Sequence, residues 1–170
     1  MRFVSCLALF ATLLLGFACA GGVRVNLTPS MPPGVYRLAD GVPQRGDIVT
    51  FCLPDDEAVW ALKRGYIGAG SCPSGTQPLL KYLAAVPGDR IEVSPESISV
   101  SAPSGPACLW PASPLSQDKS GRELVANVSS GVVPDGAALV LALHPGSFDG
   151  RYFGLVSFAS LRRVEPLSGR

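Results

Sequence analysis

The hydrophobic positions of the chain form one long run at the N-terminus, followed by many short ones. Residues 3–23 contain no charged side chain. A helix of that length, rising about 1.5 Å per residue, could cross the roughly 30 Å hydrocarbon core of a bilayer. The small residues Ala18 and Ala20 equally fit a cleaved secretory signal. We therefore expect residues 1–23 to be a membrane anchor or signal segment, and residues 24–170 to lie beyond the membrane.

After residue 23 the apolar positions form short segments separated by turn residues, a pattern typical of β-strands. We expect one helix at residues 55–65, because acidic residues begin it, a basic pair ends it and Gly65 follows. The predicted strands are residues 34–38 and 46–53, two strands on either side of the Pro-Gly-Asp turn within residues 79–93, residues 137–143, and one or two strands within residues 151–167.

Residues 94–135 differ from their surroundings, because they are rich in proline, serine and glycine and hold only short strand-like pieces at residues 97–101 and 123–128. We expect this stretch to be a small β-rich insertion. A length of 170 residues suits one domain. The predicted fold class is therefore mainly β: a folded sheet or barrel with a small insertion, after one N-terminal transmembrane helix.

The composition excludes several classes of partner and of chemistry. Fourteen basic and thirteen acidic residues give a net charge of +1 without a long basic run, which argues against a nucleic-acid partner. A single histidine and the lack of clustered cysteines or carboxylates argue against a metal site. No glycine-rich phosphate loop precedes a helix, so we expect no cofactor.

The cysteines fit an oxidising compartment. Cys52 and Cys72 flank a polar excursion between two predicted strands, and a disulfide closing this loop would contribute about 3 kcal/mol. Cys108 would remain unpaired. The alternative is that all three are free thiols.

Ser30 is the candidate nucleophile, because Pro29 and Pro32 restrict the backbone on either side of it. By itself this pattern more commonly marks a plain loop. A serine nucleophile needs a base. His144, with Asp149 five residues later, is one possible base, although it lies beside a proline in a turn.

The three lysines offer another base. Lys63 is expected on a helix surface and Lys119 in a polar loop, where both would stay charged. Lys81 would share one side of a strand with Leu79 and Leu83, and burial favours the neutral amine. A neutral amine can accept the proton of a serine hydroxyl. The alternative is a lysine that extends from a strand edge into water.

Three segments in this order, "TPSMPPGVYRL", "LLKYLAAVPGD" and "SFDGRYFG", resemble the conserved boxes of the type I signal peptidase family. The match is closer to its TraF-like conjugative-transfer members, since "HPGSFDGRYFG" and "RGYIGAGSCPSG" resemble segments of that group. The resemblance covers residues 28–167. One departure is Gly150, which stands where the family usually has a serine.

The resemblance implies a serine–lysine dyad of Ser30 and Lys81. It also implies that the backbone N–H of Ser30 and the hydroxyl of Thr28 form an oxyanion hole, and that Ser147 and Asp149 orient or tune Lys81. We expect Asp149 to pair with Arg151 or Arg162.

The resemblance further implies a membrane-anchored endopeptidase of the inner membrane with its catalytic domain in the periplasm. Its substrate would be an exported precursor protein, notably a conjugative pilin, which it would cleave and which some relatives cyclise. The alternative function is a secreted β-rich pilus-assembly or binding protein without catalysis.

Overall fold

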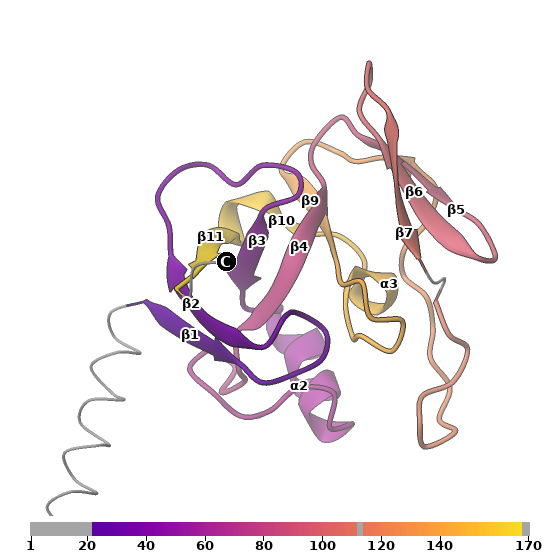
Figure 1. Ribbon diagram of the computed structural model, residues 1–170. Coiled ribbons are helices and arrows are strands. Elements are labelled where there is room, and N and C mark those ends of the chain that lie inside the picture. Colours follow the sequence, from indigo (N-terminus) through magenta and orange to yellow (C-terminus); the bar gives the residue numbers. More distant parts are fainter. Residues whose placement is uncertain (1–21, 112–113, 168–170) are drawn as a thin grey trace, which may run out of the picture.

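The computed structural model describes residues 22–111 and 114–167, which form a mainly β protein (Figure 1). Most predicted elements are confirmed. The strands of the first half are β1 (Val23–Asn26), β2 (Gly34–Leu38), β3 (Ile48–Phe51), β4 (Leu79–Ala85) and β5 (Arg90–Val93). Those of the second half are β6 (Ser97–Ser101), β7 (Ala107–Pro111), β8 (Gly131–Val132), β9 (Ala137–Leu141), β10 (Val156–Ser157) and β11 (Arg162–Pro166).

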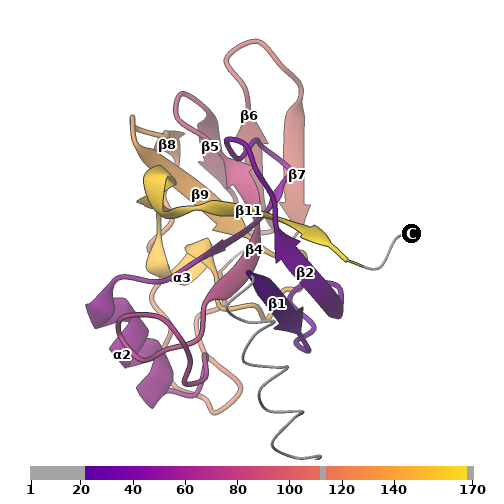
Figure 2. The same cartoon turned by 90° about the vertical axis from the view of Figure 1, so that its left-hand side faces the viewer.

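Helix α2 (Asp55–Lys63) begins with three acidic residues and ends with Lys63, as the sequence predicts. It lies beyond the ends of β3 and β4 (Figures 1 and 2). Two shorter helices are α3 (Gly150–Phe153) and the 3₁₀ turn η1 (Phe158–Ser160).

The strands build two sheets. The larger has seven strands in the order β1-β2-β11-β3-β4-β9-β10, and the smaller has four in the order β7-β6-β5-β8. Every pairing is antiparallel. Figure 1 shows β5, β6 and β7 to one side of the larger sheet. The extent of the predicted insertion, residues 94–135, stays a prediction.

Strand β4 lies inside the larger sheet and joins the two apolar cores. Adjacent side chains point to opposite faces, so Leu83 packs with Val49 and Phe51 in one cluster, whereas Ala84 packs with Ile91 and other residues of the smaller sheet in the second, which Ala85 also joins. The register of β4 against β9 shifts between Leu83 and Ala85. A strand held from both sides and both faces is a rigid support for any side chain it carries.

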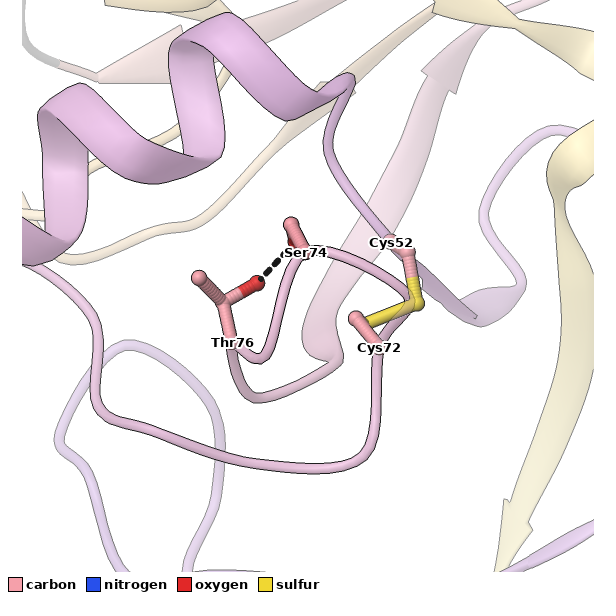
Figure 3. The surroundings of a disulfide bond; sticks show 4 residues. All are labelled: Cys52, Cys72, Ser74 and Thr76. Carbon is pink, nitrogen blue, oxygen red and sulfur yellow. Dashed lines mark hydrogen bonds between the residues drawn. A yellow bond between two sulfur atoms is a disulfide. The ribbon is translucent and has the colours of Figure 1, made fainter.

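The predicted disulfide is confirmed: Cys52, just after β3, is bonded to Cys72 (Figure 3). The two cysteines are 20 positions apart in the sequence, and the loop between them contains α2. Just after this loop, Ser74 and Thr76 are joined through their hydroxyls at 2.9 Å. Cys108 is a free, exposed thiol on β7.

The structure corrects one strand prediction. Residues 123–128 form no strand: Leu124 lines a cavity, and Val125 is exposed to solvent instead of packing against a sheet. The prediction of one or two strands within residues 151–167 is confirmed by β10 and β11, which follow the short helix α3; the Asp149 carboxylate caps that helix by accepting a hydrogen bond from the Arg151 N–H.

The first described strand begins where the predicted N-terminal segment ends. Val23, the last residue of that segment, lies in β1, which is paired along its length with β2. Residues 1–21 of the predicted anchor lie outside the described residues. In the described part, no helix has the length and apolarity to span a bilayer.

Candidate active site

A cavity of about 670 Å³ opens where three segments meet: the turn between β1 and β2, the start of β4, and the loop after β9. Ser30, Lys81 and Ser147 come from these three segments, in that order, and all line it. Residues 50 or more positions apart in the sequence thus face one space.

Ser30 is held in a fixed turn. Its neighbour Met31 is 2% exposed, so the chain on that side is anchored in the interior. The hydroxyl of Tyr36 donates a hydrogen bond of 2.6 Å to the carbonyl of Pro32. The half-buried side chain of Ser30 faces the cavity from this turn.

Lys81 is buried, as the strand pattern predicts. Its residue exposure is 4%, and it lies opposite Val49 in the register of β3 and β4. The ammonium donates a hydrogen bond of 2.9 Å to the hydroxyl of Ser147. Burial lowers the pKa of Lys81 from 10.5 to about 8, although the charge of Asp149 acts in the opposite direction. A lysine in this state is neutral in an appreciable fraction of molecules near neutral pH.

Beyond Ser147 lies a fully buried ion pair between Asp149 and Arg151, with 2.7 Å between Oδ2 and Nη1. This is one of the two pairings that we expected. Burial raises the pKa of the Asp149 carboxyl, while Arg151 and the backbone N–H groups of Arg151 and Ala142 oppose that rise. Arg151 also donates to the carbonyls of Pro111 and Ala142, so it ties β7 to the end of β9. The pair fixes the loop that carries Ser147.

Thr28 takes part in a short chain of hydroxyls that the sequence did not reveal. Its Oγ1 lies 2.8 Å from the Oγ of Ser30 and donates a 2.8 Å hydrogen bond to Oδ1 of Asn26. We had not considered Asn26. The signal was present, because an asparagine just before a proline-rich turn commonly bonds the backbone two residues later, and the N–H of Thr28 does donate to Asn26.

His144 lines the cavity but is not arranged as a base supported by an acid. Its Nδ1 accepts a hydrogen bond from the N–H of Gly146 at 3.0 Å. Asp149, the acid considered for it, is instead bonded to Arg151 and Ala142. Among residues 22–111 and 114–167, no group of three or more His, Cys, Asp or Glu is placed to hold a metal ion.

The far wall of the cavity is a segment between β7 and β8 that we had not connected with the site. Asp118 accepts a hydrogen bond of 2.6 Å from the hydroxyl of Tyr66 and pairs with Arg122 at 2.7 Å. Leu115 donates its N–H to the hydroxyl of Tyr152. Figures 1 and 2 show this segment descending from the small sheet toward α2.

Gly150, the departure from the family pattern, is explained by packing. A Cβ at this position would lie 2.7 Å from both Cδ1 of Leu139 and the carbonyl oxygen of Val140. The backbone of α3 approaches β9 too closely for the usual serine, unless the strand shifts.

Sequence comparison decides the family. The profile described as signal peptidase, peptidase S26, matches residues 1–163. The chain belongs to the S26 signal peptidase family. Among similar proteins, the probable conjugal transfer protein TraF of Sinorhizobium fredii is 39% identical over 145 residues, with 83% of this chain and 73% of that protein covered. The conjugal transfer protein TraF of Agrobacterium tumefaciens is 37% identical, with 95% and 90% covered.

A solved signal peptidase I from Enterococcus faecalis matches 75% of this chain and 99% of its own, with a TM-score of 0.41 and 24% identity. The family assignment rests on the profile and the TraF relatives.

Proposed function

We propose that this chain is a membrane-anchored serine endopeptidase with a Ser30–Lys81 dyad. The observation that carries the proposal is the buried amine of Lys81, whose pKa is lowered to about 8, in the same cavity as the hydroxyl of Ser30. Of the three lysines, Lys63 and Lys119 are exposed. Membership in a family of signal peptidases supports the same chemistry.

In the proposed reaction Ser30 Oγ attacks the scissile carbonyl carbon. Neutral Lys81 takes the hydroxyl proton, and the carbonyl π electrons move to the oxygen, which the Ser30 N–H stabilises. Lys81 then gives its proton to the leaving amine, and the acyl-enzyme remains. Attack by water releases a linear product, whereas attack by an amine of the same chain would close a ring.

Ser147 keeps the amine of Lys81 in place through its hydrogen bond, and Asp149 with Arg151 fixes the loop that holds Ser147. The substrate that we propose is an exported precursor protein, a conjugative pilin first among candidates, because the relatives at 34–39% identity carry conjugal or plasmid transfer names. The corresponding place is the inner membrane, with the catalytic domain in the periplasm.

The test is co-expression with a candidate pilin precursor, followed by measurement of the intact mass of the product. We expect Ser30→Ala and Lys81→Ala each to abolish cleavage. The matched control is Lys63→Ala, an exposed lysine outside the cavity, which should cleave normally. Lys119 lines the cavity, so it is not a neutral control.

A product lighter by one water than the trimmed linear chain would show cyclisation. Unchanged processing by both Ser30→Ala and Lys81→Ala would refute the dyad and favour a non-catalytic assembly protein. Loss of activity in His144→Ala, together with an active Lys81→Ala, would favour a serine–histidine hydrolase.

A further inference from the structure

Asn26 is the most extensively hydrogen-bonded side chain of the turn that carries Ser30. It is 7% exposed. Its Nδ2 lies within hydrogen-bond distance of three backbone carbonyls, those of Thr28 at 3.0 Å, Met31 at 2.9 Å and Pro32 at 3.2 Å. Its Oδ1 accepts from the N–H and from the hydroxyl of Thr28. One side chain therefore contacts both ends of the turn.

These partners allow only one orientation of the Asn26 amide. A carbonyl can only accept, so three carbonyls require the NH₂ group on their side. The N–H of Thr28 can only donate, so it requires the oxygen on the other side. Reversal of the amide would place oxygen against oxygen three times and donor against donor once.

The fixed amide also determines where the hydroxyl protons point. Thr28 has one hydroxyl proton, and the oxygen of Asn26 takes it at 2.8 Å. The 2.8 Å contact between Thr28 and Ser30 must then be donated by Ser30. In the resting site the proton of Ser30 is therefore directed to Thr28, while the amine of Lys81 is directed to Ser147.

We infer that Asn26 is a positioning residue of the reaction: acting through Thr28, it fixes the place and donor direction of the Ser30 hydroxyl. This rests on the proposed function. The Ser30 O–H turns from Thr28 to Lys81 as the reaction begins, and its proton passes to the amine while the electron pair on Oγ forms the bond to carbon. Thr28 can donate to the oxyanion formed from the substrate carbonyl only after its hydroxyl has broken its hydrogen bond to Asn26.

The test is a double-mutant cycle of Asn26→Ala and Thr28→Val, with kcat and KM measured on a fluorogenic peptide spanning a precursor cleavage site. Thr28 is exposed, so Thr28→Val keeps the fold even if Asn26→Ala does not. Misplacement of a reacting group by about 1 Å costs on the order of 100-fold in rate, so we expect each single variant to lower kcat about 10- to 100-fold with KM within about twofold. Thr28→Ser keeps the hydroxyl and should restore most of the rate.

The cycle separates positioning from a general loss of structure. If Asn26 acts through Thr28, the double variant is little slower than Thr28→Val alone, and the midpoint of the pH–rate profile is unchanged, because Lys81 stays buried. Additive losses, an unchanged kcat in Asn26→Ala, or a midpoint moved toward the ordinary lysine value would each overturn the inference. If Ser30→Ala retains activity, the proposed function itself is wrong. If Ser30→Ala is inactive but the Asn26 and Thr28 losses are additive, only the inference about Asn26 is wrong.

Discussion

At the scale of single residues, the amine of Lys81 is buried away from water. The lysine is the third residue of β4, a strand that is paired on both sides, and Ser147 provides its hydrogen-bond acceptor. A charged amine in such a place loses hydration that one hydroxyl cannot replace. The physical consequence is an amine that can lose its proton near neutral pH, which affects both the proposed activity and the stability of the protein.

The pH dependence of activity follows from the lowered pKa of Lys81. Because only the neutral amine can accept the proton of Ser30, we expect kcat/KM to rise with pH and to level off above about 8. The measurement is a pH–rate profile of the free enzyme on a precursor peptide. A rate that continues to rise toward pH 10 would show that the working lysine is solvated.

Removal of the positive charge of Lys81 should stabilise the protein. Below pH 8 Lys81 is protonated in both the folded and unfolded states, so the folded state carries the full unfavourable effect of burial. Between about 8 and 10.5 the folded protein has released a proton that the unfolded chain retains, so stability of the parent rises with pH. We expect Lys81→Met to raise the free energy of unfolding by about 1–3 kcal/mol at pH 7, and by less at pH 10.

Urea unfolding of both proteins at the two pH values measures this difference. Lys63→Met is the control, since its amine is exposed and its loss should change stability little. A Lys81→Met protein that is less stable than the parent at pH 7 would contradict the burial argument.

At the scale of elements, two short segments depend on close contacts rather than on propensity. Helix α3 has only four residues, and it stays in place because Asp149 caps it and Gly150 rests directly on β9. The loop containing α2 is closed by the disulfide, next to the wall of the cavity. Each of these segments carries or borders the proposed site.

Gly150→Ala should destabilise the protein by about 1–3 kcal/mol, because the new methyl group overlaps the strand beneath it. Thermal unfolding gives the measurement. The control is Gly105→Ala, at an exposed turn where the new group would meet only the Cβ of Ala102, at 3.1 Å. Equal midpoints for both variants would mean that α3 moves away from β9 freely.

The disulfide gives a second prediction at this scale. Replacing Cys52 and Cys72 together by serine should lower the free energy of unfolding by about 3 kcal/mol, because the unfolded chain regains the freedom of a loop of about 20 residues. Cys108→Ser, which removes the exposed free thiol, should leave it unchanged. Reduction of the parent protein should reproduce the double variant, and a stable reduced protein would contradict the prediction.

At the scale of the whole molecule, the cavity has a charge that the overall composition does not suggest. The net charge is only +1. Yet the described residues that line the cavity include a single carboxylate, Asp118. Besides Lys81, they include four lysine or arginine side chains, Arg24, Arg64, Lys119 and Arg122. Such a surface favours a substrate segment with negative charge.

We therefore expect a precursor peptide with one glutamate in the cavity to have a KM about three- to fivefold lower than its glutamine counterpart at low salt, with the difference shrinking in 0.5 M NaCl. The measurement is a set of peptides in which glutamate or glutamine is moved along the sequence. Lys119→Ala should reduce the preference and Lys63→Ala should not. Equal KM values for every glutamate peptide and its glutamine counterpart at low salt would refute the expected preference for negative charge.

Local sequence pattern was enough to predict several elements. Short apolar runs between turn residues predicted β2, β3 and β4, and the charges at its two ends predicted α2. The place of Lys81 within such a run predicted its burial, because side chains two positions apart share one face of a strand. Spacing and compartment predicted the bond between Cys52 and Cys72.

How distant segments meet depends on tertiary packing. Asn26 acquires its role from carbonyls that the turn brings around it, and the wall at Asp118 depends on a tyrosine 52 positions earlier in the chain. Gly150 is required by the approach of a helix to a strand. No local pattern encodes such contacts, because they arise from the packing of surfaces whose relative placement is set by the whole sheet.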